Sequence, residues 1–169
     1  GINFLDTAEM YPVNPVRKAT VGNSEKCIAN WIAKSGRRDD IVIATKAGGD
    51  SQMVRDGEGY GPDNILSVLD GNLQRLGTDY IDLYQLHNVR IEPVLDDELW
   101  ETLDALVAEG KVRALGVALG PAIGWIDDGV EAIRRRNICS LQTVFNILEQ
   151  GPGLTFAAEP NVADGRVSL

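Results

Sequence analysis

The sequence predicts an α/β fold, part of a (β/α)8 TIM barrel with parallel strands, and three observations lead to this prediction. Short apolar segments alternate with longer segments of helical periodicity along most of the 169 residues. The short segments are apolar on both faces, which is typical of parallel strands covered by helices. Five strand–helix units occupy about 145 residues, whereas a complete barrel of eight units needs about 250. We therefore expect residues 1–169 to form a single incomplete barrel domain of about five to six of the eight units.

The expected strands are short and rich in Ile, Leu and Val: residues 2–5, 41–45, 81–86, 112–117 and 139–145. The expected helices repeat apolar residues every three or four positions, at 24–35, 63–76, 97–109 and 121–136. The first of these helices should bury one face, formed by Cys27, Ile28, Trp31 and Ile32. Residues 149–164 are weakly periodic, and residues 165–169 resemble the opening of a sixth strand.

A doubly wound sheet is the alternative arrangement for five such strands. Sheets of that class that bind dinucleotides carry a Gly-x-Gly-x-x-Gly turn after the first strand. Here that position reads Asp6-Thr7-Ala8-Glu9, so the barrel is the favoured arrangement.

Composition excludes several classes of function. The net charge of −9, from 16 basic and 25 acidic residues, argues against nucleic-acid binding, which requires a basic face. No apolar run reaches the length of a membrane span, so we expect a cytoplasmic protein without a membrane partner. Cys27 and Cys139 match no metal-binding spacing, and we expect two buried thiols and no metal. The chain opens at Gly1 within a strand pattern and stops within another, which we interpret as truncation at both ends.

Four side chains at the ends of the expected strands form a candidate reaction centre. The first strand ends at Asp6 with Tyr11 five residues later, the second ends at Lys46, and the third ends at His87, the only histidine. Taken singly, each has an ordinary structural explanation, such as a turn cap or a solvated lysine. Barrel enzymes, however, gather their chemistry at the carboxyl ends of the strands, and these residues share that face.

The chemistry of this set suits proton transfer. A phenol ionises near pH 10, and a nearby ammonium favours the phenolate, so we expect Lys46 to lower the pKa of Tyr11. Asp6 would hold the ammonium in place, and the imidazole of His87 could hydrogen-bond a substrate oxygen. Such a set can protonate a carbonyl oxygen while hydride reaches the carbon. Lys46 as a Schiff-base former in an unrelated barrel enzyme is an alternative.

Several segments resemble the aldo-keto reductase family. Residues 1–11 (GINFLDTAEMY) are similar to the signature around its catalytic Asp and Tyr, and residues 73–87 (LQRLGTDYIDLYQLH) to the signature that ends in its catalytic His. Ala44-Thr45-Lys46 matches the lysine strand, and residues 103–117 resemble the next helix–strand unit. The similarity extends from Gly1 to about Gln150. Tyr11-Pro12 and residues 22–25 (GNSE) resemble most a bacterial branch related to potassium-channel β-subunits.

The resemblance implies an NADPH-dependent oxidoreductase that reduces an aldehyde or ketone to an alcohol. It makes Tyr11 the general acid, with Lys46 lowering its pKa and Asp6 paired to Lys46, while His87 orients the carbonyl of a small-molecule substrate. It also implies that Asp6 and Gln142 lie at the cofactor, Gln142 on the nicotinamide carboxamide.

One departure from the family concerns the cofactor. The family carries Ser-Asn where this chain has Ala118-Leu119, and neither replacement can hydrogen-bond the carboxamide, although Leu119 could pack against the nicotinamide. This loss favours the alternative of a non-catalytic relative that binds a nucleotide or a partner protein. Segments that contact the nicotinamide and the 2′-phosphate in the family are also missing. We therefore expect the isolated chain to be inactive.

Overall fold

The computed structural model describes residues 1–15, 17–48, 59–120 and 125–169. Within these ranges it contains one parallel sheet of five strands in the order β1-β2-β3-β4-β5. The strands are β1 (Phe4–Asp6), β2 (Val42–Ala47), β3 (Ile81–His87), β4 (Val112–Ala118) and β5 (Ser140–Gln142). Each strand pairs in parallel with the next one along the chain. The strand order does not reverse as it would in a doubly wound sheet, and the predicted partial barrel is confirmed.

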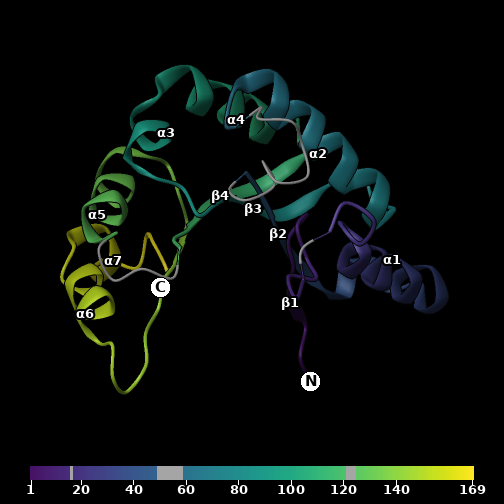
Figure 1. Ribbon diagram of the computed structural model, residues 1–169, viewed down its shortest axis with the longest axis horizontal. Coiled ribbons are helices and arrows are strands. Elements are labelled where there is room, and N and C mark those ends of the chain that lie inside the picture. Colours follow the sequence, from purple (N-terminus) through teal and green to yellow (C-terminus); the bar gives the residue numbers. More distant parts are fainter. Residues whose placement is uncertain (16, 49–58, 121–124) are drawn as a thin grey trace.

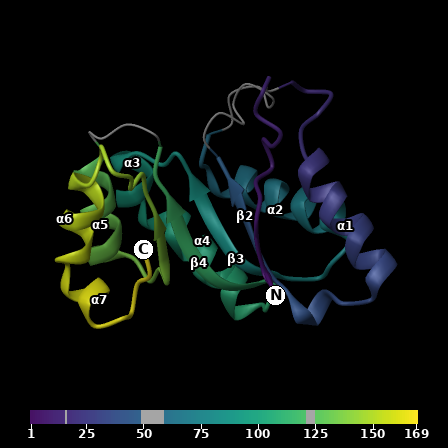
Figure 2. The ribbon, with the colours of Figure 1, turned by 90° about the horizontal axis from the view of Figure 1, so that it is seen from below.

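The helices form an arc around the outside of the curled sheet (Figure 1). They are α1 (Asn23–Ser35), α2 (Pro62–Leu76), α3 (Ile91–Leu95), α4 (Asp97–Ala108), α5 (Ile126–Arg135), α6 (Gly151–Ala157) and α7 (Pro160–Ala163), with a 3-10 turn η1 (Arg38–Asp40). Figure 2 shows α1 and α2 on the β2 side of the sheet and α5, α6 and α7 on the other side. No described helix crosses the concave inner face, which remains open to side chains from the strands.

The hydrophobic core lies between the outer face of the sheet and the helices. Ile43 and Leu86 point outward from β2 and β3 and are fully buried. They belong to one cluster with Ile65 and Leu69 of α2 and Leu103 of α4. Successive strand residues alternate between the two faces, so the residues next to these core positions point into the half-barrel. Lys46, Gln85 and His87 are therefore directed to the concave side, whereas Thr45 and Asp82 face the helices.

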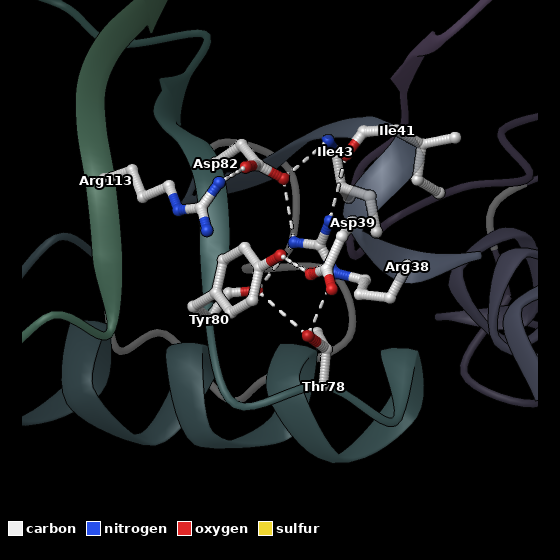
Figure 3. Close-up of polar contacts among 8 residues, drawn as sticks. All are labelled: Arg38, Asp39, Ile41, Ile43, Thr78, Tyr80, Asp82 and Arg113. Carbon is white, nitrogen blue, oxygen red and sulfur yellow. Dashed lines mark hydrogen bonds and ion pairs between the residues drawn. The ribbon is translucent and has the colours of Figure 1, made fainter. Parts of the chain in front are cut away.

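The amino ends of β2, β3 and β4 are joined by a polar cluster around Asp82 (Figure 3). Its nearly buried carboxylate accepts hydrogen bonds from Arg38 at 2.7 Å, from Arg113 at 2.9 Å and from the Ile43 amide at 3.0 Å. The guanidinium carbons of both arginines lie 4.0 Å from the centroid of the Tyr80 ring. This cluster ties three strands together at the end of the sheet opposite the predicted reaction centre.

The predicted buried face of α1 is confirmed in part, because Ile28 and Ile32 pack against the core. Ile32 is buried as expected, but Trp31 is 40% exposed and Cys27 is also exposed. The fully buried residue in the first turn is Glu25, whose carboxylate binds partners on the sheet and on α2. The expectation of two buried thiols is wrong as well, because Cys139 lies exposed just before β5 and both cysteines are free.

The C-terminal part of the chain is more regular than its composition indicated. Residues 149–164 contain α6 and α7, each with a proline in its first turn, where the missing amide costs no helical hydrogen bond. The expected strand at 139–145 is shorter, since β5 ends at Gln142. Ser168 forms a parallel bridge with Ser140, as the opening of a sixth strand would. The short α3 was not predicted, and residues 121–124 of the expected helix at 121–136 lie outside the described residues.

The described helices include none that is both long and apolar enough to cross a membrane.

Candidate active site

The predicted site residues lie at the carboxyl end of the sheet and on its inner face. Asp6, His87 and Gln142 are the last residues of β1, β3 and β5, and Lys46 is the penultimate residue of β2. Lys46 is in register with Gln85, and His87 with Ala118, which in turn pairs with Gln142. In-register residues of parallel strands point to the same face of the sheet. The strands therefore present these side chains to one concave surface, as the sequence predicted.

Lys46 is the most buried member of the site. Its side chain is 1% exposed, and its Nζ donates to Asp6 Oδ2 at 2.5 Å and to the carbonyl of Thr7 at 3.0 Å. The same nitrogen lies 5.2 Å from the centroid of the Tyr11 ring. Burial lowers the pKa of Lys46, while the hydrogen bond and the charge of Asp6 act in the opposite direction. The ammonium is thus held in one place, between a carboxylate and a phenol ring.

Tyr11 completes the group from the loop that follows β1. Its amide donates to the Ala8 carbonyl at 3.1 Å, which closes a turn. The ring meets the His87 imidazole edge-on, with centroids 5.9 Å apart and an interplanar angle of 80°. The structure therefore brings Asp6, Tyr11, Lys46 and His87 together.

The pKa of Tyr11 shifts in the direction opposite to the prediction. Burial raises it above the ordinary value of 10.0, and the Asp6 carboxylate raises it further. The prediction took account of the Lys46 ammonium but not of the desolvation of the phenol or of the carboxylate that accompanies the lysine. At neutral pH the phenol consequently retains its proton, which is the form that a proton donor needs.

Two further residues support the site. Gln85 Nε2 donates to Asp6 Oδ1 at 3.3 Å, so Asp6 is held on both oxygens. The Tyr60 hydroxyl donates to the backbone carbonyl of His87. Gln85 could have been found in the sequence, because it lies two residues before His87 and must share its face. Tyr60 lies between β2 and α2, outside any periodic segment, and no sequence pattern pointed to it.

Gln142 is separate from the four-residue group, with β4 between it and His87. Gln142 is exposed, and its backbone carbonyl accepts a hydrogen bond from the Leu119 amide at 2.9 Å. It borders a mostly apolar cavity of about 390 Å³ that Phe145 and Leu154 also line. An amide side chain beside an apolar cavity could bind a flat ring that carries a carboxamide.

The side chains of Ala118 and Leu119 point to opposite faces of the sheet. Ala118 is buried on the inner face, in register with His87 and Gln142. Leu119 packs outward against α5: a methyl group placed on Gly129 would come within 2.8 Å of Leu119 Cδ1. The hypothesis that Leu119 packs against a nicotinamide is therefore wrong, because its side chain belongs to the helix layer.

The geometry also argues against Lys46 as a Schiff-base former. That chemistry needs a neutral amine that a carbonyl carbon can reach. The Lys46 side chain is 1% exposed, and its nitrogen is bound to Asp6 and to the Thr7 carbonyl.

Comparisons with known proteins agree with this geometry. A sequence model of the aldo/keto reductase family matches residues 1–161. Protein tas from Escherichia coli (strain K12) is 38% identical over 144 residues, which is 73% of this chain and 41% of that protein. The holo form of aldo-keto reductase AKR11C1 from Bacillus halodurans superimposes with a TM-score of 0.76 and 33% identity, covering 99% of this chain and 51% of the other.

A second solved structure contains a nicotinamide cofactor. It is an aldo/keto reductase from Klebsiella pneumoniae in complex with NADP and acetate, with a TM-score of 0.71 and 25% identity. This match covers 99% of the present chain and 51% of the Klebsiella chain. The chain spans about half the length of the proteins that it matches.

Proposed function

Because this chain belongs to the aldo/keto reductase family, we propose that it supplies the proton-transfer centre of an oxidoreductase that reduces an aldehyde or ketone to an alcohol with NADPH. One observation carries the proposal. The Lys46–Asp6 ion pair lies beside the ring of Tyr11, and His87 meets that ring from another strand. A phenol, an ammonium and an imidazole then surround one point on the concave face, where a carbonyl oxygen can be bound and protonated.

Each residue has a part in this reaction that follows from its position. Tyr11 keeps its proton at neutral pH because its pKa is raised, and it donates that proton to the carbonyl oxygen. The Lys46 ammonium attracts the negative charge left on the phenol oxygen, and Asp6 fixes that ammonium in position. His87 donates a hydrogen bond that orients the substrate oxygen toward Tyr11. NADPH, when bound, supplies the hydride for the carbonyl carbon.

The residues present fit this cofactor in part. The exposed amide of Gln142 has both a donor and an acceptor for a carboxamide, and the apolar cavity beside it suits the face of a nicotinamide ring. Asp6 lies on the same concave face. Ala118, in contrast, offers no polar atom where the family has a serine, so Gln142 must hold the carboxamide without that neighbour.

The proposal is tested by measuring NADPH oxidation with a panel of aldehydes and ketones, using the protein that carries this chain. Tyr11→Phe removes the proton donor and should lower kcat by about 10²- to 10⁴-fold, the usual contribution of a general acid. Tyr80→Phe is the matched control, because Tyr80 lies in the cluster at the amino end of the strands. A Tyr11→Phe protein with unchanged turnover would contradict the assigned role. Saturable NADPH binding without reduction of any carbonyl would instead favour a non-catalytic relative.

We also propose a cytoplasmic location, where NADPH is available and the free Cys27 and Cys139 would remain reduced.

A further inference from the structure

A buried charged network lies behind the site, on the outer side of the sheet. Its centre is Glu25, which is fully buried in the first turn of α1. One carboxylate oxygen of Glu25 accepts from Thr45 Oγ1 at 2.7 Å and from Asn72 Nδ2 at 2.6 Å. The other accepts from Arg75 Nε at 2.6 Å. A single carboxylate thus joins α1, the end of β2 and α2.

Arg75 extends the network to the loop that carries Tyr11. Its Nη2 lies 3.5 Å from Glu9 Oε1, and Glu9 is itself 2% exposed. The arginine side chain runs across Gly22, where a methyl group would lie 2.3 Å from Arg75 Cδ. Gly22 in turn donates its amide to the Glu9 carbonyl at 2.7 Å. The loop is therefore tied to α2 through a side chain and to the start of α1 through its backbone.

The network and the site share the same short stretches of chain. Thr45 points outward to Glu25, and the next residue, Lys46, points inward to Asp6. Glu9 lies between Asp6 and Tyr11, and its amide donates to the Lys46 carbonyl at 3.3 Å. A displacement of Glu25 or Arg75 would consequently move the backbone on which the proton-transfer group is built.

We propose that Glu25 and Arg75 are positioning residues of the reductase site, which hold the loop from Asp6 to Tyr11 against the end of β2 and thereby keep Tyr11 beside Lys46. This inference rests on the proposed function, in which Tyr11 is the proton donor. A buried charged pair is a costly way to gain stability, because both ions lose their hydration, and apolar residues of similar volume often stabilise as well. Arg75, however, donates one short, directional hydrogen bond to Glu25 and places its charge within ion-pair distance of Glu9, so the rigid guanidinium fixes how these two carboxylates lie relative to each other.

The test separates positioning from stability by reading the ionisation of Tyr11, which faces Asp6, Lys46 and His87. Stopped-flow jumps to alkaline pH record tyrosinate absorbance before the protein unfolds, and subtracting a Tyr11→Phe partner in each background isolates Tyr11. Three variants are compared: Glu25→Gln, Arg75→Lys and, as control, Asp82→Asn. The control removes the charge of another buried carboxylate, Asp82 of β3, which binds Arg38 and Arg113 at the far end of the sheet. Arg75→Lys keeps the charge, so its effect reports geometry and not a changed electric field.

We expect the pKa of Tyr11 to fall toward 10.0 in Glu25→Gln and in Arg75→Lys, because a loosened loop exposes the phenol to water. We expect no change in Asp82→Asn, although its stability falls. In the same proteins kcat for carbonyl reduction should fall about 10- to 100-fold in the two network variants, as for a small misplacement of a reacting group. The KM for the aldehyde should change much less.

An unchanged pKa of Tyr11 in a folded Arg75→Lys protein overturns the proposal, and so does an equal shift in Asp82→Asn. If Arg75→Lys does not fold while Asp82→Asn does, the network is required for folding of the whole domain and not for positioning Tyr11. That result also overturns the proposal. The ionisation measurement needs no turnover. It therefore remains decisive if Tyr11→Phe proves active and the proposed function itself fails.

Discussion

Removing Asp6 from the Lys46–Asp6 pair should lower the free energy of unfolding more than removing Lys46. The Lys46 side chain is 1% exposed, whereas that of Asp6 is 32% exposed. Asp6→Asn leaves a buried ammonium that water cannot reach, and removing one partner of a buried pair costs about 3–5 kcal/mol. Since the Thr7 carbonyl still accepts from the ammonium, we expect the free energy of unfolding to fall by about 3 kcal/mol. Lys46→Met leaves a carboxylate that water and Gln85 can solvate, and we expect a loss of about 1.5 kcal/mol.

The cost of Asp6→Asn should also depend on pH. Burial already lowers the pKa of Lys46 from 10.5, and Asp6 counteracts this effect, so the pKa falls further without Asp6. Between that lower value and 10.5 the unfolded chain binds more protons than the folded protein does, so the free energy of unfolding rises with pH. The difference between the variant and the unchanged protein should therefore be largest at lower pH and shrink as the pH rises. The deprotonated amine needs no counter-charge.

Urea unfolding followed by circular dichroism at neutral and alkaline pH measures both effects. Asp40→Asn is a suitable control, because the Arg37–Asp40 ion pair is exposed on both sides and should change the free energy of unfolding little. A larger loss in Lys46→Met than in Asp6→Asn would refute the reasoning from burial. A cost of Asp6→Asn that is independent of pH would refute the assignment of that cost to the lysine charge.

Three further substitutions test other features of the structure. Gly22→Ala should lower the free energy of unfolding by about 2 kcal/mol in urea titrations, because Gly22 has a φ of 74° and the methyl group would displace Arg75. Ala118→Ser places a hydroxyl beside Gln142, and fluorescence titration should find NADPH bound about three- to tenfold more tightly. Unchanged affinity would contradict a carboxamide site at Gln142. Leu119→Asn should lower the Tm without tightening NADPH binding, since its side chain packs against Gly129.

The pattern of the sequence predicted the fold and the face on which the site lies. Strand periodicity together with strand-end residues was sufficient, because a parallel barrel directs the carboxyl ends of its strands to one rim. The four residues that the strand ends suggested do meet there, although their catalytic roles stay predictions. The same reasoning could have predicted Gln85 as a site residue, because it lies two positions before His87 and therefore on the same face of the strand.

What the sequence did not predict depends on contacts between distant segments. Hydrophobic periodicity assigned the buried face of α1 to Cys27, Ile28, Trp31 and Ile32, and only the two isoleucines pack against the core. Glu25 is buried instead, because Asn72 and Arg75 of α2 hydrogen-bond its carboxylate. A buried carboxylate of this kind has no signature in a single helix. The direction of the Tyr11 pKa shift was missed for the same reason, since desolvation depends on the whole environment of a side chain.

The one-way order of the strands has a consequence for the synthesis of the chain on the ribosome. In the part of the chain that the structure describes, each strand from β2 to β5 pairs with the strand synthesised just before it. The ion pair between Asp6 and Lys46 links residues only 40 positions apart, and His87 ends the very next strand. All four residues of the acid–base group are thus synthesised before β4, and Gln142 follows two strands later.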